Sequence, residues 1–212
     1  MPRRLPVYLL LDVSGSMAGD PIEAVRNGMQ MMVSALRGEP QALETEYLSV
    51  ITFESSAKQV VPLTDLASFQ DPALSAGGTT ALGEALTLLC NKVDTEVNKT
   101  TKEAKGDWKP LVFIMTDGAP NDDWQKGAEE IKKRKLAVVA CAAGHDADTN
   151  VLKQITENVV QLKTASSGDL AAFFDWVTAS ITQGSQKVET DGEEVSGMNE
   201  LPAPPPELRI VP

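Results

Sequence analysis

Several residue types are scarce in this 212-residue chain, and each scarcity excludes a class of protein. Two cysteines cannot supply a disulfide framework, and both Cys90 and Cys141 lie in apolar runs that are typical of buried thiols. No apolar run approaches the length that crosses a bilayer, and Asp12 interrupts the run from Leu5 too early for a signal peptide. We therefore expect a cytoplasmic protein with no membrane segment.

Basic residues are also in deficit, with 19 Lys and Arg against 30 Asp and Glu, for a net charge of −11. The field of such a chain repels phosphate backbones and anionic membrane surfaces, so neither nucleic acid nor a membrane is expected as a partner. Aromatic residues make up only 5% of the chain, but hydrophobic residues reach 42%, an ordinary value for a globular protein. A chain of this length can bury one substantial core.

Short apolar stretches alternate with stretches of helical periodicity along most of the chain. The first, 5–11, is apolar on both alternating faces, which is typical of a strand inside a parallel sheet. A helix should begin at Asp20-Pro21, where a capping carboxylate precedes a first-turn proline. Strands are expected at 5–11, 47–53, 58–62, 111–115, 136–142 and 159–162, and helices at 20–36, 82–97, 124–131, 151–155 and 170–181.

This order predicts an α/β fold of the doubly wound, Rossmann-like type, with a mostly parallel central sheet and helices on both faces. The turn at 54–56 is too short for a crossover helix, so 47–62 should form a hairpin with one short antiparallel edge strand. Beyond residue 183 the composition becomes acidic and proline-rich. We expect a domain at 1–183 and a flexible tail at 184–212, whose prolines at 202–206 serve as a solvated linker or dock on a partner.

Three small oxygen-bearing side chains follow the first strand in one tight turn. Asp12, Ser14 and Ser16 carry carboxylate and hydroxyl oxygens, which suit hard divalent cations such as Mg²⁺, Mn²⁺ or Ca²⁺. A generic turn rich in Asp, Ser and Gly explains this segment equally well when it is taken alone.

Two further segments should reach the same edge of the sheet. Thr79 lies just before a helix and Asp117 just after an apolar strand, and parallel strands gather ligands at their carboxyl ends. Singly, the first could be a helix cap and the second an Asx turn. Asp122 or Asp123 is expected only to cap the helix that follows, and His145, a lone histidine in a polar loop, is given no role.

Together these segments resemble a known site. Asp-Val-Ser-Gly-Ser at 12–16, Gly-Gly-Thr at 77–79 and Thr-Asp-Gly at 116–118 look like the three parts of the metal-ion-dependent adhesion site (MIDAS) of von Willebrand factor A domains. The resemblance covers residues 5–183 and is specific, because order, spacing and placement after strands all agree.

The resemblance implies a ligand set and a mode of binding. Ser14, Ser16 and Thr79 would contact the cation directly, and Asp12 and Asp117 directly or through water. Mg²⁺ is the expected ion, with Mn²⁺ or Ca²⁺ as alternatives. A carboxylate from a partner protein would complete the coordination, so binding of an acidic partner would depend on the metal.

A narrower resemblance concerns the segments 2–53, 106–110 and 173–177, which look like the tellurium-resistance-associated (TerY-type) group of bacterial A-domain proteins. That group is often encoded beside a protein kinase and a PP2C-like phosphatase. It implies a signalling adaptor in a bacterial stress response, with those two enzymes as partners.

Two other functions compete with a metal-dependent binding protein. A metal-dependent phosphohydrolase would use Asp12 as nucleophile, but Ser14 stands where such enzymes place a second aspartate, and no acid or base is evident. The second alternative is a structural scaffold whose ion site takes no part in binding a partner. We expect a binding protein and not an enzyme.

Overall fold

The sheet is mixed, and β1 lies at its centre in this computed structural model, which describes residues 3–190, 195 and 198–212. In the described chain the strands are β1 (Leu5–Asp12), β2 (Glu46–Phe53), β3 (Ala57–Asp65), β4 (Leu111–Thr116), β5 (Ala137–Ala143), β6 (Val159–Leu162) and β7 (Leu208–Ile210). Their order across the sheet is β3-β2-β1-β4-β5-β6-β7. The five strands from β2 to β6 in that order run parallel, which confirms the predicted fold class.

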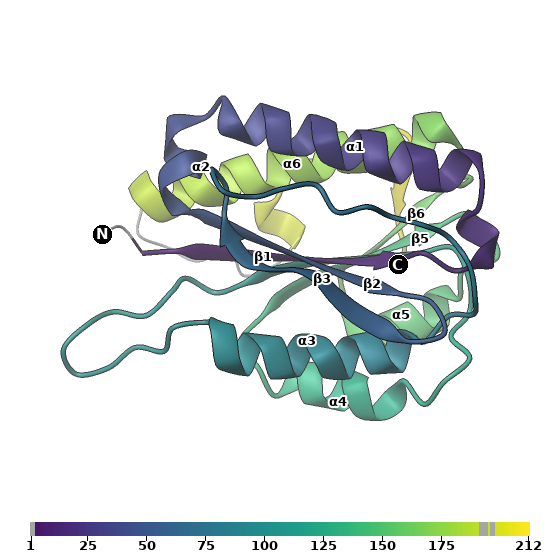
Figure 1. Cartoon of the computed structure of the whole chain (residues 1–212), viewed down its shortest axis with the longest axis horizontal. Helices are drawn as coiled ribbons and strands as arrows, with labels where there is room; N and C mark the ends of the chain where they lie inside the picture. The colour runs from purple at the N-terminus through teal and green to yellow at the C-terminus, as the bar shows by residue number, and fades with distance from the viewer. Residues whose placement is uncertain (1–2, 191–194, 196–197) are drawn as a thin grey trace.

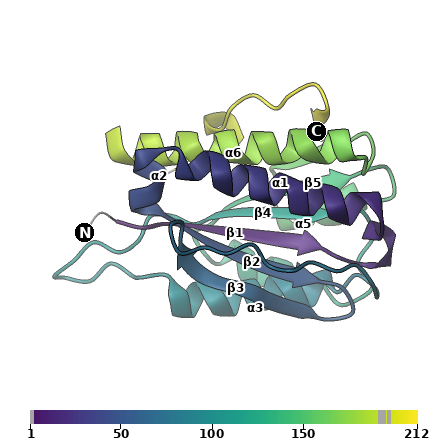
Figure 2. The ribbon, with the colours of Figure 1, turned by 45° about the horizontal axis from the view of Figure 1, so that its top comes forward.

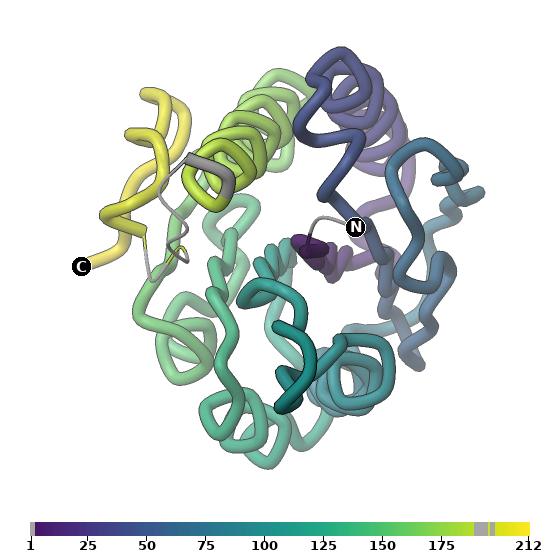
Figure 3. The backbone as a smooth tube through the Cα atoms, turned by 90° about the vertical axis from the view of Figure 1, so that its left-hand side faces the viewer, coloured from purple at the N-terminus to yellow at the C-terminus, as the bar shows by residue number. Residues whose placement is uncertain are grey.

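Helices cover both faces of the sheet. They are α1 (Asp20–Arg37), α2 (Pro40–Thr45), α3 (Leu82–Glu96), α4 (Gln125–Lys132), α5 (Thr149–Ile155) and α6 (Ser167–Thr190). Figure 1 shows α1, α2 and α6 on one face and α3, α4 and α5 on the other. Seen end-on in Figure 3, the helices surround the strands. Of the helices and strands, α2 and β7 were not predicted, because both are too short to show the hydrophobic periodicity that identifies a helix or a strand.

Strand β1 divides the interior into two cores, as its two apolar faces predict. Val7, Leu9 and Leu11 pack in the core shared with α1 and α6. Tyr8 and Leu10, which alternate with them, point to the core shared with α3, α4 and α5. Every residue of β1 is buried, so its last residue is held firmly in place at the edge of the sheet.

Helices α1 and α6 approach each other closely at Gly28. A Cβ atom at this position would lie 2.4 Å from Cδ2 of Phe174, which is closer than two carbon atoms can come. The absence of a side chain at Gly28 therefore allows the Phe174 ring to pack directly on the α1 backbone.

Both edges of the sheet are antiparallel, whereas one short antiparallel edge strand was predicted. The expected hairpin is present, but β3 has nine residues rather than five. At the other edge β7 pairs with β6, and Arg209 lies opposite Gln161. The prediction missed β7 because its three residues follow a proline-rich run that reads as unstructured.

The predicted boundary at residue 184 falls inside α6. The helix continues to Thr190, and Val188 is buried. The predicted tail is thus part of the last helix over its first residues. Residues 191–194 and 196–197 of that predicted tail lie outside the described residues.

The proline-rich segment that follows lies along α6 (Figure 2). The Trp176 indole donates a hydrogen bond to the Pro202 carbonyl oxygen across 2.9 Å. Leu201 and Leu208, on either side of the prolines, are both buried. The described part of the C-terminal segment is therefore docked on its own domain, which corrects the expectation of a flexible tail there.

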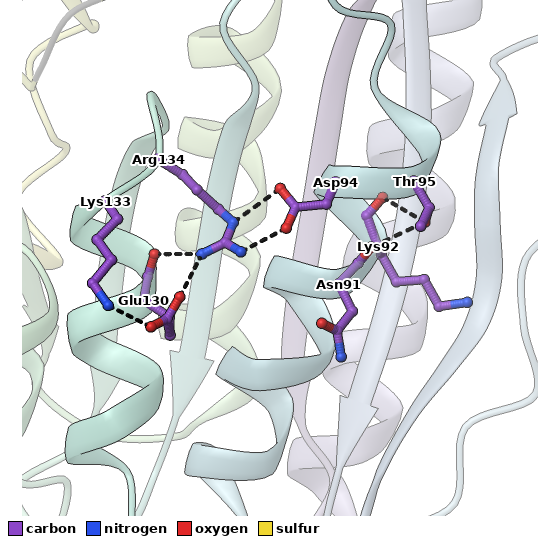
Figure 4. Close-up of polar contacts among 7 residues, drawn as sticks. All are labelled: Asn91, Lys92, Asp94, Thr95, Glu130, Lys133 and Arg134. Carbon is purple, nitrogen blue, oxygen red and sulfur yellow. Dashed lines mark hydrogen bonds and ion pairs between the residues drawn. The ribbon is translucent and has the colours of Figure 1, made fainter.

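Polar contacts join α3 to the end of α4 (Figure 4). Both guanidinium edges of Arg134 are used: Nε and Nη2 donate to the two oxygens of Asp94, and Nη1 donates to the Glu130 backbone and carboxylate. Lys133 pairs with the same Glu130 carboxylate. Such exposed pairs contribute little each, and their effect here is to fix the spacing of two helices on one face.

Both cysteines are buried and free, as predicted, with Cys90 in α3 and Cys141 in β5. Burial raises the pKa of both thiols, so neither is a reactive thiolate at neutral pH. Among the described residues no helix has the length and apolar character needed to cross a membrane.

Candidate metal centre

The centre is built on the turn that follows β1. Asp12 ends the strand, and its Oδ1 accepts a hydrogen bond from the Ser14 backbone N–H at 2.8 Å. A single turn of 3-10 helix, Gly15–Met17, then carries Ser16 back over the strand end. The three predicted side chains of this segment thus lie at the carboxyl edge of the parallel strands.

Hydroxyl groups connect this turn to the end of β4. The Ser16 hydroxyl donates to Oδ1 of Asp117 at 2.8 Å, and the Ser14 and Ser16 hydroxyl oxygens are 3.1 Å apart. The Thr116 hydroxyl donates to Oδ2 of Asp12 at 2.6 Å. Two carboxylates and three hydroxyls that are remote in sequence therefore meet in one cluster.

The loop before α3 forms the third side. The Gly77 N–H donates to the Val13 carbonyl at 2.9 Å, and the Gly15 N–H donates to the Gly78 carbonyl at 3.1 Å. Thr79 follows and is exposed, and its own N–H donates to the Ser55 hydroxyl. Its backbone thus adjoins the cluster, whereas no hydrogen bond links its hydroxyl to the other four predicted ligands in the described chain.

Gly78 makes this third side possible. Its φ of +71° lies in the left-handed region that side chains disfavour. A Cβ atom there would also lie 2.0 Å from Oε2 of Glu54 and 2.3 Å from the Ser55 hydroxyl oxygen. Only glycine allows the loop to pass this closely beneath the turn at 54–56.

Both carboxylates are withdrawn from water. Asp12 is fully buried, and burial raises its pKa, although hydrogen bonds from Ser14 and Thr116 partly oppose the shift. Burial also raises the pKa of Asp117, and the nearby Asp12 charge raises it further, against the hydrogen bond from Ser16. Among the described residues no Lys, Arg or His forms an ion pair with either group.

This donor set fits a hard divalent cation. Two buried carboxylates that face each other without a cationic side chain are unfavourable unless a positive charge joins them. Carboxylate and hydroxyl oxygens are the ligands such cations prefer. The described residues hold no cluster of three or more His, Cys, Asp and Glu, so the remaining ligands would be hydroxyls or water.

Asp122 has a role that differs from the prediction, and the neighbouring Asn121 makes contacts for which no prediction was made. Asp122 was expected to cap α4, but its two oxygens accept the Gly83 and Glu84 N–H groups at 2.9 Å and so cap α3. Asn121 exchanges hydrogen bonds with Thr80, which ties the loop after β4 to the loop before α3. No local pattern in the sequence points to these contacts, since each joins segments about forty residues apart.

Comparisons with known proteins identify the family to which this fold belongs. A model of the von Willebrand factor type A domain matches residues 7–175. A relative from Synechocystis sp., the uncharacterized protein sll0103, is 31% identical over 164 residues, which are 72% of this chain and 36% of the relative. The chain thus spans about a third of the length of the curated relative that it matches.

Solved structures share the fold. Proximal thread matrix protein 1 from the mussel byssus has a TM-score of 0.63 and 21% identity, over 85% of this chain and 48% of that one. A von Willebrand factor type A protein from Catenulispora acidiphila also has a TM-score of 0.63, with 18% identity, over 85% of this chain and 43% of that one. A second structure of the mussel protein, with a zinc-occupied MIDAS motif, has a TM-score of 0.58 and 21% identity over 83% of this chain and 45% of that one. At these identities the likeness shows the fold.

Proposed function

Since the chain belongs to the von Willebrand factor type A domain family, we propose that it is a protein-binding module whose binding depends on a divalent metal ion. The observation that carries the proposal is the hydrogen-bonded cluster in which Asp12 and Asp117 are both buried and, among the described residues, have no cationic partner. The zinc-occupied MIDAS of the structurally similar mussel protein supports a divalent cation in this family.

Each residue has a distinct part in this proposal. Asp12 and Asp117 supply the negative charge that retains the ion, while Ser14 and Ser16 supply neutral oxygens from one turn. Thr79 is the remaining predicted ligand, and its exposed side chain lies on the face that a partner would meet. When bound, the ion would supply positive charge and a coordination position for an acidic group of a partner. Mg²⁺ is the ion we propose first, with Mn²⁺ or Ca²⁺ as alternatives.

Charge explains why such a partner would need the ion. The chain carries a net charge of −11, so an acidic protein surface is repelled at long range. A divalent cation is the largest local charge in a site of this kind and can reverse that repulsion at close range.

The narrower proposal is an adaptor for a kinase and a PP2C-like phosphatase in a bacterial stress response, as in the TerY-type group. Two of the segments that resemble the TerY-type group, 106–110 and 173–177, have structural roles in this fold. Asp107 pairs with Arg4, and the Arg3 guanidinium lies 3.5 Å above the Trp108 ring, so this segment fastens the loop before β4 to the start of β1. Phe173 and Trp176 are core residues.

Calorimetry with MgCl₂ and MnCl₂ on the full chain tests metal binding. We expect saturable uptake by the wild type and its loss in Asp12→Ala and Ser14→Ala. Asp20→Asn is the matched control, because this exposed carboxylate follows the same turn without joining the cluster. No uptake by the wild type, or equal uptake in all variants, would contradict the proposal.

Capture of partners from lysate with Mg²⁺ or with EDTA separates the competing functions. A binding module loses its partners in EDTA and in Asp12→Ala, whereas a scaffold with an idle site keeps them. Recovery of a kinase or a phosphatase would support the adaptor role. Turnover of a phosphomonoester by the wild type, lost in Asp12→Asn, would instead establish a phosphohydrolase.

A further inference from the structure

A pocket lined by residues of β6, β7 and the loop after β5 opens at the same edge of the sheet as the metal centre. Its volume is about 290 Å³, and three of its lining side chains can carry positive charge. They are His145 from the loop after β5, Lys163 from the end of β6 and Arg209 from β7. The function proposed above does not use any of them.

Strand pairing brings these residues together. Arg209 lies opposite Gln161 in the β6–β7 ladder, and its Nη2 donates to the Gln161 side-chain oxygen at 3.0 Å. The Gln161 amide nitrogen in turn donates to the Gly144 carbonyl at 3.1 Å. Gly144, with a φ of +102°, turns the chain so that His145 lines the pocket. The C-terminal segment thus supplies one wall of the pocket.

The positive groups are not neutralised from within. Lys163 and Arg209 form no ion pair in the described part of the chain, and Arg209 is held by an uncharged amide. Among the described residues, Glu207 is the one acidic side chain that lines the pocket, and it forms no ion pair with Lys163 or Arg209. In a chain with a net charge of −11, the two cationic side chains outnumber the single acidic one among the described residues that line the pocket, so an anion can enter it.

The pocket and the metal centre face the same side. Asp117 follows the end of β4, and β5 and β6 lie next in the sheet, with Thr116 opposite Ala142 and Ala143 opposite Leu162. Adjacent strands are about 4.8 Å apart, so the pocket lies roughly 10–15 Å from the metal centre along the edge. An extended peptide covers this span with about three to five residues.

We propose that this pocket binds a second acidic group of the same partner protein whose first carboxylate reaches the metal. The inference rests on the proposed function and adds a recognition rule to it. The partner would present two acidic side chains about three to five residues apart in an extended segment. Lys163 and Arg209 pair with the second carboxylate, and His145 lies beside it.

The single histidine of the chain provides a probe for the pocket by itself. Full-length protein in EDTA at constant ionic strength is titrated with glutarate and, separately, with inorganic phosphate, while NMR follows the His145 imidazole. We expect a saturable shift with glutarate. A saturable shift with phosphate alone, or none with either anion, overturns the inference.

Variants assign that shift to the pocket. Lys163→Gln combined with Arg209→Gln should abolish it, whereas Lys126→Gln, an exposed lysine on α4, should leave it unchanged. Because Arg209 belongs to β7, Arg209→Lys and Lys163→Gln alone serve as milder variants that keep one or both charges. They should retain a weakened response. An unchanged response in the double variant overturns the inference.

Two synthetic peptides then test the pocket together with the metal. Both are extended in design, and one carries a single glutamate while the other carries a second glutamate four residues on. With Mg²⁺, the second peptide should bind about fivefold more tightly, the factor that two exposed ion pairs supply. The ratio should fall to about one in the double variant.

The remaining outcomes separate this inference from the proposed function. Equal binding of both peptides, still dependent on Mg²⁺, overturns the inference and leaves the proposed function standing. If neither peptide responds to Mg²⁺, the proposed function fails and the recognition rule fails with it.

Discussion

Glu46 is a buried acid outside the metal centre. It begins β2 with 1% of its surface exposed, and neither carboxyl oxygen has a hydrogen-bond partner in the described part of the chain. Burial raises its pKa to about 8, and the nearby Ser185 hydroxyl opposes only part of that shift. The folded chain therefore holds this proton at pH values where the unfolded chain has released it.

Stability should fall with rising pH because of this residue. Between the ordinary pKa of 4.5 and about 8 the folded state binds the extra proton, so the free energy of unfolding decreases across that window. Glu46→Gln cannot ionise. Its stability relative to the wild type should rise by about 2 kcal/mol or more from pH 5 to pH 9.

Urea unfolding of both proteins across this pH range measures the difference. Glu44→Gln is the matched control, because this neighbouring glutamate is exposed and should show no such trend. A difference between Glu46→Gln and the wild type that is independent of pH would contradict the expected protonation.

Individual residues of the metal centre could be predicted where the sequence pattern that identifies them lies within one short segment. Asp12, Ser14 and Ser16 share one turn after an apolar strand, and Asp117 follows another, so strand ends alone place them at one edge. The Thr116 contact with Asp12 was not predicted, since its hydroxyl belongs to a strand whose other positions are apolar. Register between strands decides that contact, and register is not visible in one sequence.

At the scale of elements, α3 depends on a cap from a distant segment. Its own N-cap residue, Ala81, makes no side-chain hydrogen bond, and Asp122 accepts the N–H groups of Gly83 and Glu84 instead. A carboxylate at this end of a helix also interacts favourably with the helix dipole. The loop after β4 is thereby attached to the start of α3.

Asp122→Ala should destabilise the chain by about 1–2 kcal/mol, the cost of losing a helix cap with charge. Unfolding is measured in EDTA, so that metal binding does not contribute. Asp123→Ala, which alters an exposed neighbour, should have no comparable effect. Equal losses in the two variants would show that general loop charge matters rather than the cap.

The repeating strand and helix pattern made most elements predictable. The expected β1, β5 and α3 lie within two residues of their observed bounds, because each carries a strong apolar periodicity. The α6 helix was expected to end near 181 and continues to Thr190, since its last turns carry few large apolar residues. There, the helix is stabilised by the contact of Ser185 with Thr45 and by the contacts of Gln183 and Lys187 with Glu200 of the C-terminal segment.

At the scale of the whole molecule, the C-terminal segment closes one edge of the sheet. Removal of residues 203–212 deletes β7, loses the burial of Leu208 and leaves the β6 edge unpaired. We expect the melting temperature to fall by about 4–10 °C, from the loss of roughly 2–3 kcal/mol. Unpaired edges also promote association, so the truncated chain should form oligomers in a concentration-dependent way.

Differential scanning calorimetry and light scattering measure both effects. Ile210→Ala is the control, because this β7 side chain is 51% exposed and contributes little burial. Mg²⁺ uptake should survive the truncation, since the predicted ligands lie elsewhere. An unchanged melting temperature would mean that the segment does not stabilise the domain.

The central place of β1 has a consequence for synthesis on the ribosome. Strand β1 is synthesised before the other strands of this sheet and can pair with β2. Its other edge stays unpaired until β4 is complete, some sixty residues after the end of β2. At translation rates of 5–20 residues per second, this edge of β1 remains without a partner strand for about 3–13 s. The half-made sheet is then exposed to mispairing with neighbouring chains, so this protein should depend most on nascent-chain chaperones before Thr116 has left the exit tunnel.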